Sequence, residues 1–247
     1  MSVLAIISDS NGSGKTATAS ALKIQLEKAG LELNLVKLST TSESSAIEDK
    51  IYSGLQPKFK GPSSIEINSE EINETSGSVT WSLDDQYIFY SRLDKHHRPR
   101  KIYRHKIGTL IKNDQLIYEE KDKGFTCGID ISSDEKYFLI KTSDLTTSEI
   151  YFFDVNEVNP KPKLFKKRQK EIEYTIDSWK GNFYIYTNLD AEDFKICTCK
   201  HDNIEKWQDY IRATNGVLIG GFNLLNEWMV RSELRDALSK LYVRNLN

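Results

Sequence analysis

A repeated pattern of tight turns and aromatic-rich segments constrains the fold of this chain more than any other feature. It occurs four times, and each copy has a polar turn marked by Asp85, Asp134, Gly181 or Asn226. The intervals between these markers are 49, 47 and 45 residues. Periods of about 40–50 residues with about four strands each are typical of β-propeller blades. Each blade is a small twisted sheet that cannot bury both faces alone, so blades stack on their neighbours.

Each turn is preceded by a short strand-like segment and followed by an apolar strand. In three repeats a third segment follows, which we predict to be an outer strand: "KIYRHKI", "SEIYFFD" or "FKICTCK"; the fourth repeat ends in "SKLYVRNL". A β-sandwich also has alternating strands, but it lacks this period. We therefore predict a mainly β fold, a partial propeller of about four blades over residues 65–247.

The first 40 residues have a different pattern. Residues 3–7 are apolar and predict a buried strand, residues 15–30 predict a helix, and residues 31–38 alternate like a second strand. This is one β-α-β unit, a P-loop-like segment over residues 1–40. Residues 41–64, in a polar stretch rich in Ser, Pro and Gly, predict a linker to the propeller.

The loop of that unit, "SDSNGSGKTAT", resembles the opening of P-loop proteins of the cobyrinate-synthase and dethiobiotin-synthase kind. Its candidate phosphate-binding residues are Gly12, Ser13, Gly14, Lys15 and Thr16. In such loops backbone N–H groups surround the phosphates, the lysine neutralises them and the hydroxyl holds Mg²⁺. The first glycine of the pattern is replaced by Asp9, and no further parallel strand or acidic metal ligand precedes the linker. Binding of ATP and Mg²⁺ therefore rests on the loop alone.

Composition excludes several classes of function. The 34 basic and 36 acidic residues give a net charge of −2, which argues against a nucleic-acid or membrane-surface binder. No apolar run approaches the roughly 18 residues of a membrane span, and no signal peptide is evident. Three cysteines favour a reducing compartment over a disulfide framework, so we expect a cytoplasmic protein. Cys197 and Cys199 share one face of a strand without further metal ligands, and no metal site is predicted.

The segment "INETSGSVTWSLDDQYIFYSRLDKHHRPRKIYRHKIGTL" at 72–110 resembles the propeller of the prolyl oligopeptidase family, in its oligopeptidase B branch. The resemblance continues in order through "LTTSEIYFFDV", "EYTIDSWKGNFYIYTN" and "GVLIGGFNLL". It implies a seven-bladed propeller that caps an α/β-hydrolase domain with a Ser/Asp/His triad. The implied substrates are short peptides cut after Arg or Lys.

None of that catalytic chemistry can be assigned to residues of this sequence. The chain has no G-x-S-x-G motif, the strained turn that presents a hydrolase serine. Ser76, Ser148 and Ser232 have no paired His and Asp in the pattern and are interpreted as structural. Two charged segments are interpreted as solvated loops: the basic run "KPKLFKKRQK" at 161–170, and the acidic residues Glu119, Glu120 and Asp122, which are not taken as a receptor for a basic side chain.

The leading hypothesis is the propeller portion of an oligopeptidase B-like serine peptidase, inactive without a hydrolase domain and able to act on peptides only when one is supplied. The alternative is a small nucleotide-binding P-loop protein that uses the propeller as a scaffold. A third is a module that binds extended peptides at its strand edges. Two incomplete folds in one chain suggest a fused or truncated reading frame, and open blade edges predict self-association.

Overall fold

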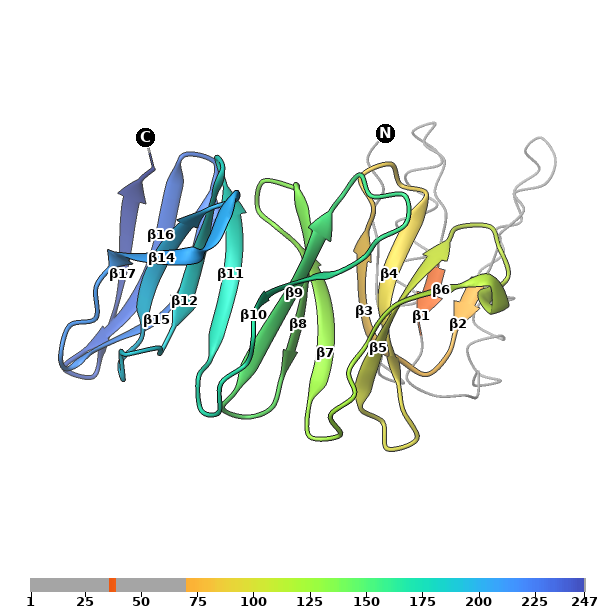
Figure 1. Cartoon of the computed structure of the whole chain (residues 1–247), viewed down its shortest axis with the longest axis horizontal. Helices are drawn as coiled ribbons and strands as arrows, with labels where there is room; N and C mark the ends of the chain where they lie inside the picture. The colour runs from red at the N-terminus through yellow and green to blue at the C-terminus, as the bar shows by residue number, and fades with distance from the viewer. Residues whose placement is uncertain (1–35, 39–69, 247) are drawn as a thin grey trace, which may run out of the picture. The chain divides into compact units, whose positions relative to one another are not determined.

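The computed structural model of the chain describes residues 36–38 and 70–246, whose regular structure is almost entirely β-strand (Figure 1). They belong to two compact units, Met1–Glu119 and Glu120–Asn247. The strand expected at 3–7, the helix expected at 15–30 and the linker at 41–64 lie outside the described residues. Among those that are described, no helix is long and apolar enough to cross a bilayer.

The first unit contains a four-stranded antiparallel sheet in the order β3-β4-β5-β6. Its elements are β3 (Thr75–Trp81), β4 (Tyr87–Leu93), β5 (Pro99–Lys106), the 3₁₀ turn η1 (Ile111–Asn113) and β6 (Gln115–Glu119). Two short strands, β1 (Val36–Leu38) and β2 (Glu70–Ile72), pair in parallel. The strand expected at 31–38 is thus confirmed over its last three residues.

A buried polar cluster fixes the segment before β6 in this unit. Asp114 accepts a hydrogen bond from Tyr90 Oη at 2.8 Å, and its other oxygen lies 2.6 Å from His105 Nδ1. The side chains of His105 and Asp114 are 0% and 2% exposed. Burial and the bond to Asp114 raise the pKa of Tyr90, so its hydroxyl stays a donor. The cluster is satisfied internally and is closed to ligands.

The second unit contains three antiparallel sheets whose strands follow one another in chain order. The first has β7 (Thr126–Ile131), β8 (Tyr137–Ser143), β9 (Ser148–Asp154) and β10 (Lys163–Lys166). The second has β11 (Tyr174–Trp179), β12 (Asn182–Thr187), β13 (Lys195–Lys200) and β14 (Asn203–Ile211). The third has β15 (Val217–Leu225), β16 (Trp228–Arg235) and β17 (Leu238–Asn245).

The middle sheet is buried on both faces. Phe183 and Ile185 of β12 pack into a core shared with the β7–β10 sheet, whereas Tyr184 between them packs on the β15–β17 sheet. Because successive side chains of a strand point to opposite faces, a strand buried on both sides is apolar throughout. That explains the uninterrupted "FYIY" of β12, and it shows that these sheets stack as the repeat predicts.

The segments predicted to be outer strands are, in three of the four sheets, the third strands. A further strand, β6, β10 or β14, pairs outside them. That prediction was wrong because the true edge strands have weak patterns. Strand β10 has only four residues and an irregular register, and β14 carries several charged residues among its apolar ones.

The turns that mark the repeats have the backbone conformation that hairpins require. Lys180 and Gly181, between β11 and β12, have φ of 48° and 80°. Two successive positive φ values match the type I′ turn, whose twist fits antiparallel strands. In the first two repeats a single residue, Asp85 or Glu135, has a positive φ of 57° or 54°. The turn positions predicted from the sequence are therefore confirmed.

Candidate functional site

The turn between β7 and β8 is joined to β11 of the neighbouring sheet by side-chain hydrogen bonds. Ser133 donates from both its backbone N and its Oγ to Asp177, at 2.7 and 2.5 Å. Ser178 donates to Asp134 at 2.9 Å. Burial raises the pKa of Asp177 and outweighs the hydrogen bonds from Ser133, which lower it. We call these four residues, with His201, the inter-sheet seam.

The inter-sheet seam brings a serine, a histidine and carboxylates together, but it is not a hydrolase triad. His201 Nε2 lies 2.9 Å from Ser178 Oγ, and its Nδ1 lies 3.3 Å from Tyr137 Oη. In a triad the carboxylate orients the histidine; here Asp134 binds the serine instead. Ser178 is 0% exposed, so no substrate reaches its hydroxyl. Burial lowers the pKa of His201, which favours the neutral ring of a structural hydrogen-bond chain.

Ser148, interpreted as structural from the sequence, is confirmed in that role. Its hydroxyl donates to the Tyr174 carbonyl oxygen at 2.7 Å and accepts from the Tyr174 N–H at 2.6 Å. These bonds join β9 to β11, from one sheet to the next. The side chain is buried and already carries two partners, which leaves it no capacity as a nucleophile.

Of the three acidic candidates, Glu120 lies in a buried ion cluster rather than a solvated loop, whereas Asp122 is exposed. Glu120 accepts hydrogen bonds from Thr142 Oγ1 at 2.5 Å and Arg168 Nη2 at 2.7 Å. Arg168 also binds Glu149 through Nε and Nη2, at 3.1 and 2.8 Å, and its guanidinium lies 4.0 Å from the Phe125 ring centroid. The side chains of Glu120 and Glu149 are only 3% and 5% exposed.

Hydrogen bonding favours the ionised form of Glu120. Burial by itself raises the pKa of Glu120, but hydrogen bonds from Thr142, the Asp122 N–H and Arg168 outweigh it and lower that pKa. The solvated-loop interpretation was therefore wrong for Glu120. In the basic run at 161–170 it was wrong for two residues: Phe165 of β10 is buried in the core and Arg168 neutralises two carboxylates, whereas most of the lysines are exposed. Because that arginine occupies Glu120, the carboxylate is not open to a basic peptide side chain.

The two neighbouring cysteines of β13 lie in the core as free thiols. Cys197 and Cys199 of β13 face the same side, as predicted, and pack among the aromatic residues shared by two sheets. Burial raises the pKa of each thiol to about 11. In the described part of the chain no group of three or more metal-ligating side chains comes together.

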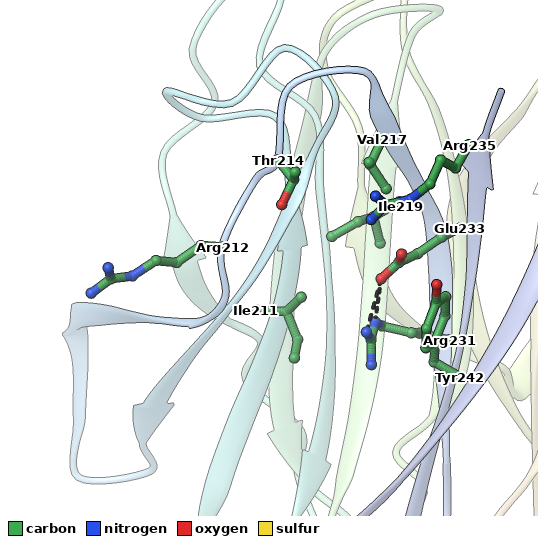
Figure 2. A pocket seen from close by; sticks show the side chains of 9 residues that line it. All are labelled: Ile211, Arg212, Thr214, Val217, Ile219, Arg231, Glu233, Arg235 and Tyr242. Atoms are coloured by element: carbon green, nitrogen blue, oxygen red, sulfur yellow. Dashed lines mark hydrogen bonds and ion pairs between the residues drawn. The ribbon is translucent and has the colours of Figure 1, made fainter.

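A pocket of about 210 Å³ lies between the end of β14 and the β15–β17 sheet (Figure 2). Its polar lining comes mainly from β16. Arg231, Glu233 and Arg235 are two residues apart from one to the next, so they lie on the same face of that strand. Arg231 donates from Nε and Nη2 to Glu233 Oε1, both at 2.8 Å, and its guanidinium lies 4.6 Å from the Tyr242 ring centroid. This pocket was not predicted from the sequence, although the i, i+2, i+4 spacing of charged residues in "RSELR" was the available signal.

The five loop residues predicted to bind phosphate, Gly12 to Thr16, lie outside the described residues. What it does describe is a series of four antiparallel sheets with consecutive strands, which defines the class: a partial β-propeller.

Comparison with known proteins specifies the class further. Residues 56–247 match the prolyl oligopeptidase N-terminal beta-propeller domain, and the chain belongs to that family. It is 36% identical over 123 residues to Protease 2 of Moraxella lacunata, and 28% identical over 193 residues to dipeptidyl aminopeptidase BI of Pseudoxanthomonas mexicana. These matches cover 50% and 75% of this chain, but 18% and 26% of the relatives.

A solved structure with a similar fold is oligopeptidase B from Trypanosoma brucei with covalently bound antipain, in a closed form. The TM-score is 0.68 at 25% identity, over 71% of this chain and 26% of that one. Oligopeptidase B from Leishmania major gives a TM-score of 0.67 at 20% identity, over 70% and 24% of the two chains. The chain thus spans about a quarter of the length of these proteins, and the part that matches the family belongs to the propeller domain.

Proposed function

We propose that this chain serves as the propeller portion of a serine peptidase similar to oligopeptidase B, and that it restricts an α/β-hydrolase domain to short peptides. The observation that carries the proposal is the match of residues 56–247 to the propeller domain of that family. The sheets supply a scaffold without a cofactor or metal of their own. The buried Ser178–His201 pair and the absence of a G-x-S-x-G motif from the sequence support inactivity of the chain by itself.

The test is a peptidase assay with and without a hydrolase domain. The purified chain is expected to leave fluorogenic peptides with Arg or Lys before the scissile bond uncleaved. The same substrates, and a folded protein substrate, are then offered to the hydrolase domain of the Moraxella lacunata relative made without its propeller. Adding the chain should suppress cleavage of the folded protein relative to the peptide, whereas albumin at equal concentration should not. Cleavage by the chain alone that a serine-directed inhibitor abolishes would contradict the proposal.

We also propose that copies of the chain associate through the outer face of the β15–β17 sheet. On that face Leu225, Trp228, Leu241 and Val243 are 56%, 45%, 75% and 64% exposed. The strand register places them together, and the charged residues of these strands point to the opposite face. An apolar sheet face of this kind favours association, because burying it removes apolar surface from water. Size-exclusion chromatography with light scattering tests it: a concentration-independent monomer would contradict association.

A second candidate function is nucleotide binding by the loop Gly12–Thr16, favoured by the "GSGKT" sequence and its resemblance to P-loop proteins. The assay is equilibrium binding of a fluorescent ATP analogue with Mg²⁺. Lys15→Ala should abolish the signal, since that lysine neutralises the phosphates. An equal signal from both proteins removes this candidate.

We also propose that the protein is cytoplasmic, and its three free cysteines support this location.

A further inference from the structure

We infer that the pocket beside β16 binds a small aliphatic carboxylate, with Arg235 as the residue that pairs with the acid group. The inference is independent of the proposed peptidase role, because it rests on the pocket's own charge, shape and lining. Figure 2 shows the side chains of Arg231 and Arg235 extending toward the middle of the pocket, whereas Arg212 extends away from it.

The charge of the pocket is unbalanced. Three of its lining residues are arginines, and only Glu233 is acidic. Glu233 is 7% exposed and is already neutralised by the two bonds from Arg231, which also stacks on Tyr242. Arg235 makes no ion pair with any described residue, so its guanidinium is available to an anion. A guanidinium presents its donors in a planar fork that fits a carboxylate bidentately.

The remaining wall is apolar. Val217 and Ile219 of β15 are 4% and 2% exposed, and Ile211 of β14 lines the pocket with them. Pockets for drug-sized ligands are larger, about 300–1,000 Å³, so a volume of about 210 Å³ suits a group of a few heavy atoms. A carboxylate with a short branched hydrocarbon chain fits both sides of the pocket, because its acid group pairs with Arg235 and its hydrocarbon packs on the apolar wall. The Glu233 carboxylate disfavours a phosphate dianion, because a second negative charge at the site is repelled more strongly than one.

Two sources supply this chemistry: the C-terminal residue of a peptide, and a free aliphatic acid. N-acetyl-Ala-Leu and 4-methylpentanoate represent them, and N-acetyl-Ala-Leu-amide lacks the charge. Binding is measured by ligand-observed NMR titration of the whole chain. We expect saturable binding of at least one acid and none of the amide. If the dipeptide binds more tightly, the source is a peptide C-terminus; if 4-methylpentanoate does, it is a free acid.

Arg235→Gln should weaken binding of the preferred acid at least tenfold, with an unchanged circular dichroism spectrum. The matched control is Arg244→Gln, which removes the same charge from the same sheet face six residues along β17, ~20 Å from the position opposite Arg235. It should leave affinity unchanged. Three results overturn the inference: equal binding of the amide, equal weakening by the two substitutions, or tighter binding of inorganic phosphate than of either acid.

Discussion

Replacing Arg168 by methionine should destabilise the second unit strongly, because the arginine neutralises two carboxylates that are almost fully buried. Methionine keeps an unbranched apolar side chain and removes the guanidinium, together with its ion pairs and its stacking on Phe125. Glu120 and Glu149 would remain 3% and 5% exposed in the folded chain without their counter-charge. Removing one partner of a buried ion pair costs about 3–5 kcal/mol. Since domains unfold with about 5–15 kcal/mol, this is a large share of the total stability.

The assay is urea denaturation followed by tryptophan fluorescence, since Trp179 and Trp207 lie in this unit. With a slope of about 2–3 kcal/mol per molar urea, the expected loss moves the midpoint by roughly 1–2 M. Lys170→Met is the matched control. Its ion pair with Glu171 spans 3.6 Å, with side chains 90% and 71% exposed, and exposed pairs contribute only about 0–1 kcal/mol.

The loss should also depend on pH. The pKa of Glu120 is lowered in the folded wild type, so its stabilisation is present above the unfolded-state pKa and disappears as the pH falls through the folded one. Without Arg168, Glu120 loses a hydrogen bond and a nearby positive charge that both lower its pKa. The difference between variant and wild type should therefore be largest near pH 7 and shrink towards pH 4. A loss below about 1 kcal/mol at pH 7, or one independent of pH, refutes the account of a buried, charge-neutralised cluster.

Three further predictions concern the seam, the core and the outer sheet face. Ser178→Ala should destabilise the chain by about 1–3 kcal/mol in urea titrations, because it removes the donor to Asp134 Oδ2 and the hydroxyl that contacts His201; a neutral effect would mean that these bonds contribute nothing to stability. The thiols of Cys197 and Cys199 should resist a thiol reagent at pH 8 and react in urea, because burial raises their pKa to about 11; fast native reaction would contradict their burial. Trp228→Lys should shift the light-scattering mass towards the monomer, whereas Leu238→Lys, on the opposite face, should not.

The sequence was sufficient for the repeat, the turns and the class of fold. Asp134 and Gly181 are recognisable as turn residues because backbone strain limits which side chains adopt a positive φ nearby, and this constraint is local. The uninterrupted apolar run of β12 is also visible in the sequence, since side chains that alternate between two buried faces are all apolar. The family resemblance, drawn from residues 72–110 onward, was confirmed by the match over residues 56–247.

Tertiary structure alone decided which charged residues are buried and with whom. Glu120 and Arg168 are 48 residues apart and pair only because the fold brings together the segment before β7 and the segment after β10, so neither segment predicts the other. The same holds for Ser178 and Asp134, and for the end of β14 that closes the pocket over Arg235. Local propensity is encoded in neighbouring residues, but the burial of a charge depends on contacts between distant ones, which only the packed sheets bring together.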